Sequence, residues 1–358
     1  MIRLASLIEQ FGEAFIQQYS DRLLPSHLKA IERMKQCRSS YSPKMLVQCQ
    51  ACEHQEFIPH SCGHRNCPQC QHYESQQWIE KQLKKQLPVT YFMLTFTLPA
   101  EFRSLAWQHQ RLIYGLLFDC VWQTVKRFTK QDKKLGGMPG ATAVLHTHSR
   151  ALDFHPHVHL LIPAASVDMK KREWRKKEEK YLFNHKALAT MFRAKFLHAL
   201  VQQGFTLPVC YPKKWVVNCR QMGGGKNALI YLGKYLYRGV ISENNILSCH
   251  QGLVTFQYQD SETKKMKRRT VSGVHFLWLV FQHILPRGFR RARDYGFLHP
   301  NSHKLRLLLF YLLKFDPLRW IPVKAPRPQK SCRCCGGDMV IVQTNIRASD
   351  LVIQLCPT

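Results

Sequence analysis

One stretch, residues 153–162, constrains the fold of this chain more than any other because of its periodicity. Polar and apolar residues alternate there with a period of two, which is the pattern of a half-buried strand. In a strand that period places His155, His157 and His159 on one face and the apolar residues between them on the other. Imidazole is the commonest metal ligand near neutral pH. The stretch therefore predicts a strand that holds a metal ion, rather than an exposed strand that is merely rich in histidine.

A third imidazole precedes this strand. Residues 141–147 also have the composition of a strand, and only a short loop separates them from the His strand, so we expect the two to be antiparallel neighbours. His146 lies eleven residues before His157, and a hairpin would bring it near the pair. His146 is thus a candidate third ligand. The alternative, that it only packs or contacts DNA, stays open at this point.

The charge of the chain indicates its class of partner. Lys and Arg number 53 and Asp and Glu 23, which gives a formal charge of +30. A protein this basic binds polyanions, and nucleic acid is the first candidate. A merely solvated basic surface or an anionic membrane are alternatives, although no basic amphipathic helix stands out. A metallohydrolase of small molecules would explain the His strand but not this charge.

We expect the cellular compartment from the lack of a membrane-spanning run and of a signal pattern in the sequence. No apolar run is long enough to span a bilayer, and the N-terminus has no signal pattern, so we expect a cytoplasmic protein. In a reducing compartment, fourteen cysteines are metal ligands or free thiols rather than disulfides.

Six cysteines are concentrated in residues 37–72, a segment with too few apolar residues to form a core of its own. Cys49 and Cys52 form one Cys-x-x-Cys pair, Cys67 and Cys70 form another, and fourteen residues separate the two pairs. Two such pairs can complete one four-thiolate zinc site, which would supply folding free energy. We therefore predict a structural Zn²⁺ at these four residues.

Other cysteines stay unassigned. Cys37 and Cys62 could complete a second site or substitute in the first. Near the C-terminus, Cys332 and Cys335 form a pair that resembles half a zinc knuckle, but no second pair follows downstream, so we assign no metal to it.

Residues 227–239 predict a helix that presents two phenols. Tyr231 and Tyr235 are four residues apart and share one face, while Lys234 and Arg238 form a cationic flank. The alternative is that the tyrosine face is simply core or interface. A later cluster, after an apolar helix at 274–284, mixes basic and aromatic residues as a single-strand groove does. Its candidate DNA-binding residues are Arg287, Arg290 and Arg291.

These features together suggest one chemistry. A phenol is a poor nucleophile at neutral pH because its pKa is about 10. A divalent ion that polarises a phosphate and neutralises developing charge compensates for this. The product, a phosphotyrosine ester, keeps the bond energy for rejoining and divides one step into two.

The motifs resemble those of a known family. The HUH endonucleases carry His-hydrophobic-His, here His157-Val158-His159, and a tyrosine helix. Within them, the chain resembles the two-tyrosine rolling-circle transposases of the IS-ninety-one type. The resemblance covers residues 30–335 and is carried by four stretches: the cysteines of 49–70, His146-Thr147 with 155–159, Tyr231-Leu232-Gly233-Lys234-Tyr235, and 283–296. One departure is Asn66, where the family usually has His before Cys-Pro-x-Cys.

The resemblance implies a fold and a domain order. The fold class is α+β, with an antiparallel ferredoxin-like HUH core flanked by helices and preceded by a small Cys-rich zinc module. We expect a helical segment at 1–36, a zinc-binding, DNA-contacting domain at 37–86, the catalytic domain at 87–320 and a Pro-linked tail at 321–358. Pro156 would be awkward inside a central strand, so we expect it at the strand's start.

The resemblance also implies an activity. The chain would be a metal-dependent transposase that cleaves and rejoins single-stranded DNA at insertion-sequence ends in bacteria. Tyr231 or Tyr235 would form a 5′-phosphotyrosine, and Mg²⁺ or Mn²⁺ would be held by His157 and His159, with His146 as the possible third ligand. A relaxase or replication initiator with the same chemistry is one alternative. A zinc-finger DNA-binding regulator without activity is another.

Overall fold

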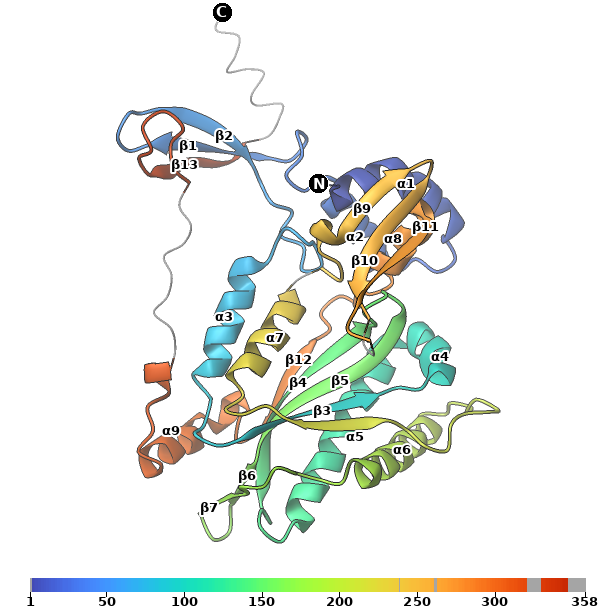
Figure 1. Cartoon of the computed structure of the whole chain (residues 1–358), viewed down its shortest axis with the longest axis vertical. Helices are drawn as coiled ribbons and strands as arrows, with labels where there is room; N and C mark the ends of the chain where they lie inside the picture. The colour runs from blue at the N-terminus through green and yellow to red at the C-terminus, as the bar shows by residue number, and fades with distance from the viewer. Residues whose placement is uncertain (1, 238, 261–262, 321–329, 347–358) are drawn as a thin grey trace, which may run out of the picture. The chain divides into compact units, whose positions relative to one another are not determined.

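The structure is a computed structural model that describes residues 2–237, 239–260, 263–320 and 330–346 (Figure 1). Contacts divide the chain into two compact units. The first comprises the described residues of Met1–His72, Tyr237–Ile284 and Pro322–Thr358, and the second comprises Tyr73–Leu236 and Leu285–Ile321. Neither unit is continuous in sequence, and the division at residues 36, 86 and 320 stays a prediction.

The second unit is built on a seven-stranded sheet in the order β7-β6-β4-β5-β3-β8, with β12 paired to β4. Its pairings are all antiparallel among the described residues. The strands are β3 (Tyr91–Thr97), β4 (Met138–His148), β5 (Phe154–Pro163), β6 (Ala165–Asp168), β7 (Glu173–Lys176), β8 (Val217–Gln221) and β12 (Ala292–Gly296). The strands expected at 141–147 and 153–162 are β4 and β5, and they pair as expected.

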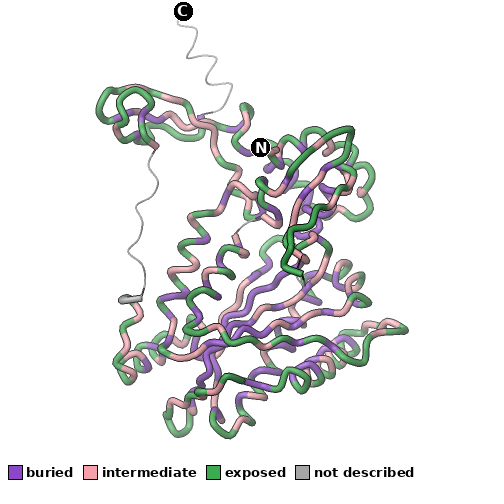
Figure 2. Tube along the Cα trace, in the orientation of Figure 1, coloured by how far each residue is buried: buried purple, intermediate pink, exposed green. Residues whose placement is uncertain are grey.

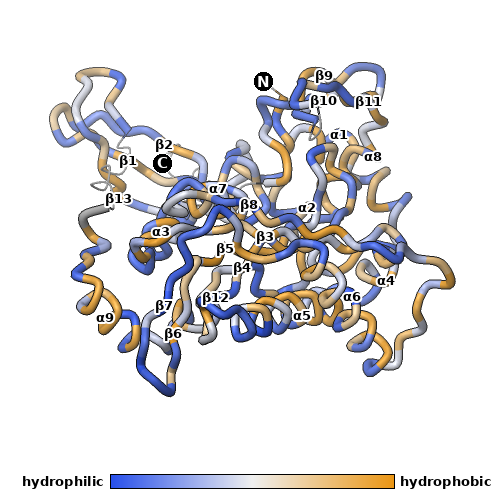
Figure 3. The backbone as a smooth tube through the Cα atoms, turned by 60° about the horizontal axis from the view of Figure 1, so that its bottom comes forward, coloured by the Kyte–Doolittle hydropathy of each residue, from blue (hydrophilic) through white to orange (hydrophobic). Residues whose placement is uncertain are grey.

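The helices of this unit lie on both faces of the sheet (Figures 1 and 3). They are α3 (His72–Leu83), α4 (Arg103–Gln108), α5 (Gln110–Gln131), α6 (His185–Gln202), α7 (Lys226–Tyr237) and α9 (His303–Leu312), with short 3₁₀ turns η1 (Ala100–Phe102), η3 (Pro300–Ser302) and η4 (Pro317–Trp320). Helices α4 and α5 are separate because His109, between them, leaves the helical region at φ −122° and ψ 44°.

The order β3-α5-β4-β5-α6-β8 is a βαββαβ unit, and the strand order β4-β5-β3-β8 gives it the ferredoxin-like arrangement. Alternate residues of the central strands, such as Phe96, Leu145 and Val158, pack with α5 and α6 in the main core. Figure 2 shows these strands as the most buried part of the unit. The sequence-based fold class is confirmed. Because side chains alternate along a strand, the histidines face the opposite side, where α3 and α7 lie.

Pro156 occupies a position that its missing N–H tolerates. It is the third residue of β5, where the β4–β5 register shifts between His146 and His148. A register shift interrupts the ladder of hydrogen bonds, so a residue without an N–H costs little there. The carbonyl of Pro156 still accepts a hydrogen bond of 3.1 Å from the amide of Leu98.

The first unit contains two small sheets and three helices. One sheet has the order β11-β10-β9 and the other β13-β1-β2. The elements are α1 (Leu4–Gln18), α2 (Pro25–Lys35), β1 (Lys44–Cys49), β2 (Gln55–Pro59), η2 (Glu243–Asn245), β9 (Ile246–His250), β10 (Leu253–Gln259), β11 (Met266–Ser272), α8 (Gly273–Phe281) and β13 (Met339–Ile346). Helix α1 packs against α8, with Phe15 and Phe281 5.7 Å apart between ring centroids.

In the part of the chain that the structure describes, none of the helices has the length and apolar character required to cross a bilayer.

Candidate active site and metal centres

Strand pairing brings three imidazoles together in the second unit. His146 on β4 lies directly opposite His157 on β5, and His159 follows two residues later on the same face. The ring of His146 is 5.1 Å from that of His157 and 4.2 Å from that of His159, centroid to centroid. Their nearest ring nitrogens all lie within 4.8 Å of one another. The three donors can therefore reach one ion.

Hydrogen bonds fix how two of these rings present their nitrogens. Nδ1 of His157 donates to the carbonyl oxygen of His155 at 2.7 Å, and Nδ1 of His159 lies 3.0 Å from Oγ1 of Thr95. Such partners orient a ring and leave Nε2 free as a ligand. Nε2 of His146 is buried and has no hydrogen-bond partner, an arrangement that a bound ion would satisfy.

The protonation state of the cluster also suits a metal. Burial holds the pKa of His146 and His157 well below the usual value, and the neighbouring imidazoles also disfavour the protonated form. Burial lowers the pKa of His159 to about 4. Near neutral pH all three imidazoles are uncharged, which is the form that binds a metal ion.

His155 stands apart from this cluster. A guanidinium nitrogen of Arg103 donates to its Nδ1 at 2.7 Å, so that nitrogen is an acceptor already in use. Its alternation along β5 places it beside His157, yet it does not join the group of three.

Helix α7 places both phenols against the imidazoles. The ring of Tyr235 lies nearly parallel to that of His146, at 6°, and its hydroxyl is 2.8 Å from Nδ1 of His148. The ring of Tyr231 is 6.2 Å from those of His146 and His159. The structure therefore brings together residues that are about 70 to 90 positions apart in sequence.

The close approach of α7 depends on a glycine between the two tyrosines. A Cβ at Gly233 would overlap the side chains of Ile79 and Trp78 on α3. The Ser75 hydroxyl donates to the Gly233 carbonyl at 3.0 Å and fixes the two helices together. At the start of α7, Gly225 has φ +83° and packs directly on Tyr91 of β3. The helix is thus tied both to α3 and to the sheet.

Each phenol has a cation nearby. Burial raises the pKa of both tyrosines, while Arg150 acts in the opposite direction on Tyr231 and Arg291 does so on Tyr235. The guanidinium carbon of Arg291 is 4.9 Å from the Tyr235 ring centroid. Tyr231 is 51% exposed, so a strand of DNA could reach it from solvent.

Arg291, a candidate DNA-binding residue, is buried. It is only 4% exposed, and its Nε donates to the Leu145 carbonyl at 3.1 Å. The reason is that β12 pairs with β4 from Ala292 onward, and the Leu145 amide donates to the Arg291 carbonyl at 2.9 Å, so Arg291 lies against β4. Its place is at the Tyr235 phenol rather than in an exposed groove.

Three of the other predicted DNA-binding residues are accessible to solvent, and the fourth is not among the described residues. Lys234, Arg287 and Arg290 are exposed. Arg290 lines a cavity of about 460 Å³ together with Arg111 of α5 and with neighbours of Arg290 in the chain. Arg238 lies outside the described residues.

The largest correction concerns the cysteines. The expected single site of Cys49, Cys52, Cys67 and Cys70 is not formed. Instead, the described part of the first unit contains two groups of four thiols, each with all sulfur atoms within 4.8 Å. One group is Cys37, Cys62, Cys67 and Cys70, and the other is Cys49, Cys52, Cys332 and Cys335. The pair Cys49 and Cys52 thus lies with Cys332 and Cys335, and the pair Cys67 and Cys70 lies with Cys37 and Cys62.

The first group has the dimensions of a zinc–thiolate tetrahedron. Sulfur–sulfur distances of 3.6 to 3.7 Å join Cys70 to Cys37 and Cys62, and Cys67 to Cys37. A Zn–S bond of about 2.3 Å requires about 3.8 Å between sulfur atoms. Because four thiols are present, no histidine is needed at position 66, where Asn66 instead donates to the His283 carbonyl at 3.4 Å.

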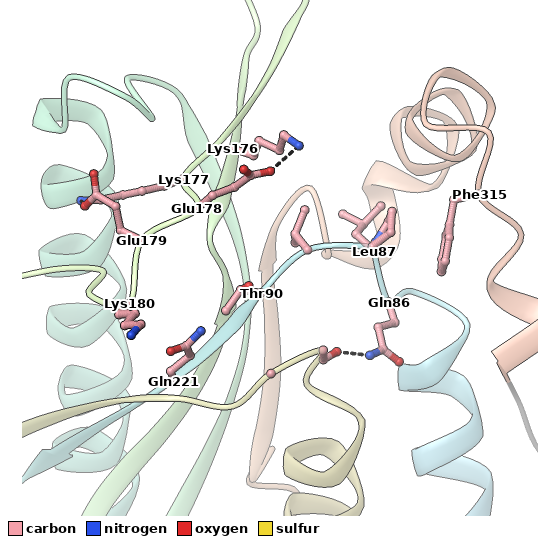
Figure 4. A pocket seen from close by; sticks show the side chains of 14 residues that line it. Gln86, Leu87, Thr90, Lys176, Lys177, Glu178, Glu179, Lys180, Gln221 and Phe315 are labelled. Atoms are coloured by element: carbon pink, nitrogen blue, oxygen red, sulfur yellow. Dashed lines mark hydrogen bonds and ion pairs between the residues drawn. The ribbon is translucent and has the colours of Figure 1, made fainter.

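A separate pocket of about 630 Å³ is lined by both lysines and glutamates (Figure 4). Lys176 and Glu178 form an ion pair at its rim, and Thr90 and Gln221 lie along its wall. None of the clustered imidazoles or phenols lines it. We therefore place the candidate active site at the histidine cluster.

A ferredoxin-like sheet with a His-hydrophobic-His strand, faced by a helix with two tyrosines, is an HUH-type fold. The chain belongs to the transposases that carry an IS91-type zinc-binding domain. A family model described as putative transposase matches residues 140–306, and one described as transposase zinc-binding domain matches residues 7–98. The two matches do not overlap and together span more than half of the chain.

Curated relatives agree with this assignment. The chain is 29% identical to the putative transposase y4qJ of Sinorhizobium fredii, over 85% of this chain and 82% of that protein. It is 25% identical to the transposase for insertion sequence element IS801 of Pseudomonas savastanoi pv. phaseolicola, over 76% of this chain and 70% of the other.

Solved structures with local similarity are complexes of the conjugative relaxase TrwC with oriT DNA. A metal-bound complex is 13% identical, with 54% of this chain and 72% of that chain covered and a TM-score of 0.29. A complex with mutant oriT DNA is 18% identical, with 36% and 49% covered and a TM-score of 0.27.

Proposed function

We propose that this transposase cleaves and rejoins single-stranded DNA at the ends of an insertion sequence through a 5′-phosphotyrosine intermediate, in rolling-circle transposition. The observation that carries the proposal is the contact between Tyr235 of α7 and His146 of the imidazole cluster, with Tyr231 beside it. The contact places a hydroxyl nucleophile next to residues that could hold a divalent ion.

His146, His157 and His159 would hold a divalent ion, Mg²⁺ or Mn²⁺. The buried and unpartnered Nε2 of His146 and the oriented rings of the other two support this ligand set. When bound, the ion supplies polarisation of the scissile phosphate and neutralisation of its developing charge. Three protein ligands would leave such an ion able to bind phosphate oxygens.

The residues of the chain supply the nucleophile and its base. The Tyr235 hydroxyl attacks phosphorus, so that the Oη–P bond forms while the bond from phosphorus to the 3′-oxygen breaks. The phenol proton passes to Nδ1 of His148, 2.8 Å away, and the leaving 3′-oxygen is protonated by solvent. Attack of a 3′-hydroxyl on the phosphotyrosine reverses the sequence and rejoins the strand.

The second phenol allows a second cleavage before release. Tyr231 is exposed and has Arg150 as its nearby cation, whereas Tyr235 is half-buried beneath Arg291. Each cation would stabilise the phenolate that leaves on rejoining. Two nucleophiles with separate cations can hold two DNA ends at once, as transfer of an element from donor to target requires.

DNA binding would come from the exposed cations around this site. Lys234 follows Tyr231 on α7, and Arg287 and Arg290 lie in the segment that leads into β12. Contacts with phosphates are independent of sequence and depend on salt. The formal charge of +30 supports the same partner, and a cytoplasmic location is consistent with it.

The zinc-binding domain would hold Zn²⁺ at Cys37, Cys62, Cys67 and Cys70. The sulfur distances fit a closed four-thiolate site, which is the structural rather than the catalytic type.

The test uses a single-stranded oligonucleotide that spans one end of the element, labelled at its 3′ end, with Mg²⁺. Attack through a 5′-phosphotyrosine attaches the labelled 3′ fragment to the protein, so we expect a labelled band that survives denaturation. The same oligonucleotide labelled at its 5′ end should release a free fragment that ends in a 3′-hydroxyl. A DNA-binding regulator without activity would leave no covalent label, and that result would overturn the proposal.

A further inference from the structure

We infer that Cys49, Cys52, Cys332 and Cys335 form a second structural zinc site, which closes a three-stranded ribbon from two distant parts of the chain. The match to a transposase zinc-binding domain covers residues 7–98 and so does not include Cys332 or Cys335. The inference concerns the first unit alone and does not depend on the proposed chemistry of the second.

The four sulfur atoms have the geometry of a metal site rather than of disulfides. Cys49 and Cys335 are 3.4 Å apart, Cys52 and Cys332 are 3.6 Å apart, and all four sulfurs lie within 4.8 Å. A disulfide needs about 2.05 Å between sulfurs. The two Cys-x-x-Cys segments thus converge from opposite sides on one point, as the ligands of a tetrahedral ion do.

Both Cys-x-x-Cys turns have the same local hydrogen bond. The amide of Ala51 donates to Sγ of Cys49 at 3.4 Å, and the amide of Cys334 donates to Sγ of Cys332 at 3.4 Å. In each turn the donor is two residues after the first cysteine. Amide donors aimed at sulfur favour the thiolate, which is the form that binds zinc.

The residues after Cys335 allow the two turns to meet. Gly336 has φ +75°, which other residues rarely adopt. A Cβ at Gly337 would lie 3.0 Å from that of Ala51 and 3.3 Å from the sulfurs of Cys49 and Cys335. The glycine pair therefore fits close packing of the second turn on the first.

Apolar burial in the ribbon is small. Among the described residues, its buried cluster consists of Val47, Cys49, Cys332 and Met339, with Ile58 packed at the edge, and other side-chain contacts between its two parts are polar, such as the ion pair of Lys330 with Glu56. Strand β13 pairs with β1 along its length, yet most of its side chains are exposed. A sheet this small cannot fold on apolar burial alone, so a bound ion would supply the missing free energy. Zinc at this site would fasten β13 to the N-terminal domain.

The experiment measures zinc bound to the purified full-length chain under reducing conditions, by elemental analysis and by release to a colorimetric chelator. We expect two zinc ions per wild-type chain. The double variant Cys332→Ser/Cys335→Ser should retain one, and its residues 330–346 should become sensitive to protease. Cys334→Ser is the matched control, because Cys334 is exposed, lies between two ligands and belongs to neither group. It should retain two.

Cobalt substitution adds a spectroscopic readout of thiolate ligation, which the wild-type chain alone can give. Two four-thiolate sites should give a sulfur-to-cobalt charge-transfer band that saturates at two equivalents in wild type and at one in the double variant. One zinc per wild-type chain, two in the double variant, or a mass under non-reducing conditions that shows disulfides among these four cysteines would each overturn the inference.

Discussion

The Tyr235 hydroxyl lies 2.8 Å from Nδ1 of His148, while its ring is stacked on His146. One phenol thus contacts both a candidate metal ligand and a candidate base. Both histidines are on β4, two residues apart, where the register shift toward β5 follows His146. Residues two apart in a strand share a face, so both rings can contact the same phenol.

If His148 accepts the Tyr235 proton, its loss should slow that nucleophile specifically. In a Tyr231→Phe background, His148→Ala should reduce the rate of adduct formation about 10²- to 10⁴-fold, the usual contribution of a general base. Oligonucleotide affinity should change little. His185→Ala, at an exposed position on α6, serves as the control. An unchanged rate in the His148 variant would show that the proton goes elsewhere.

Gly233→Ala tests whether the spacing between α7 and α3 positions the tyrosines. The added methyl group would overlap Ile79, and overpacking of this kind costs about 1–3 kcal/mol. The better helix propensity of Ala would offset about 1 kcal/mol of that. We expect a lower denaturation midpoint and a disproportionate loss of adduct. Replacing Ile79 with Ala in the same chain should restore both. If it does not, the packing of Gly233 on Ile79 is not what positions the tyrosines for adduct formation.

Asp294 holds β12 in place through a buried network. Its carboxylate is 2.5 Å from Nζ of Lys85 and accepts from the Thr142 hydroxyl at 2.7 Å and from Gln82 at 3.2 Å. Asp294→Ala leaves the ammonium of Lys85 without its partner, which should destabilise the second unit by about 3–5 kcal/mol in urea unfolding. Glu178→Ala removes the carboxylate of an exposed ion pair and should have no measurable effect. Equal changes in the free energy of unfolding in the two variants would contradict the claim that the Asp294 network stabilises the second unit.

Removal of divalent ions should stop cleavage before it stops DNA binding. We expect a brief treatment with EDTA to abolish adduct formation while oligonucleotide affinity, which depends on surface cations, is retained. His159→Ala should behave as the treated wild type does. The zinc content must be measured in the same samples, since loss of zinc would affect folding. Parallel loss of binding and cleavage, with zinc retained, would mean that the histidine ion is only structural.

Local sequence patterns predicted much of this structure, and long-range pairing explains what they missed. The alternation through His157 and the spacing of Tyr231 and Tyr235 depend on periodicity alone, so the strand and the helix were predictable. The zinc ligands were not, because spacing within Cys49-x-x-Cys52 says nothing about which distant pair completes the shell. Cys335, 286 residues from Cys49, is brought near only by the pairing of β13 with β1.

Arg291 shows a different reason why the sequence alone did not predict the site in full. Composition made it a candidate DNA-binding residue of a single-strand groove, but β12 was not predicted, and the pairing of that strand with β4 accompanies burial of the guanidinium beside Tyr235. Similarly, the interruption of the helix at His109 has no glycine or proline to indicate it.

The most direct test of the account is the covalent adduct formed by the tyrosine variants on a 3′-labelled single strand. Tyr231→Phe and Tyr235→Phe should each reduce the adduct, and peptide mapping should place the remaining label on the other tyrosine. The double variant should still bind the oligonucleotide but form no adduct. An adduct that survives in the double variant would contradict the assignment of these phenols as the nucleophiles.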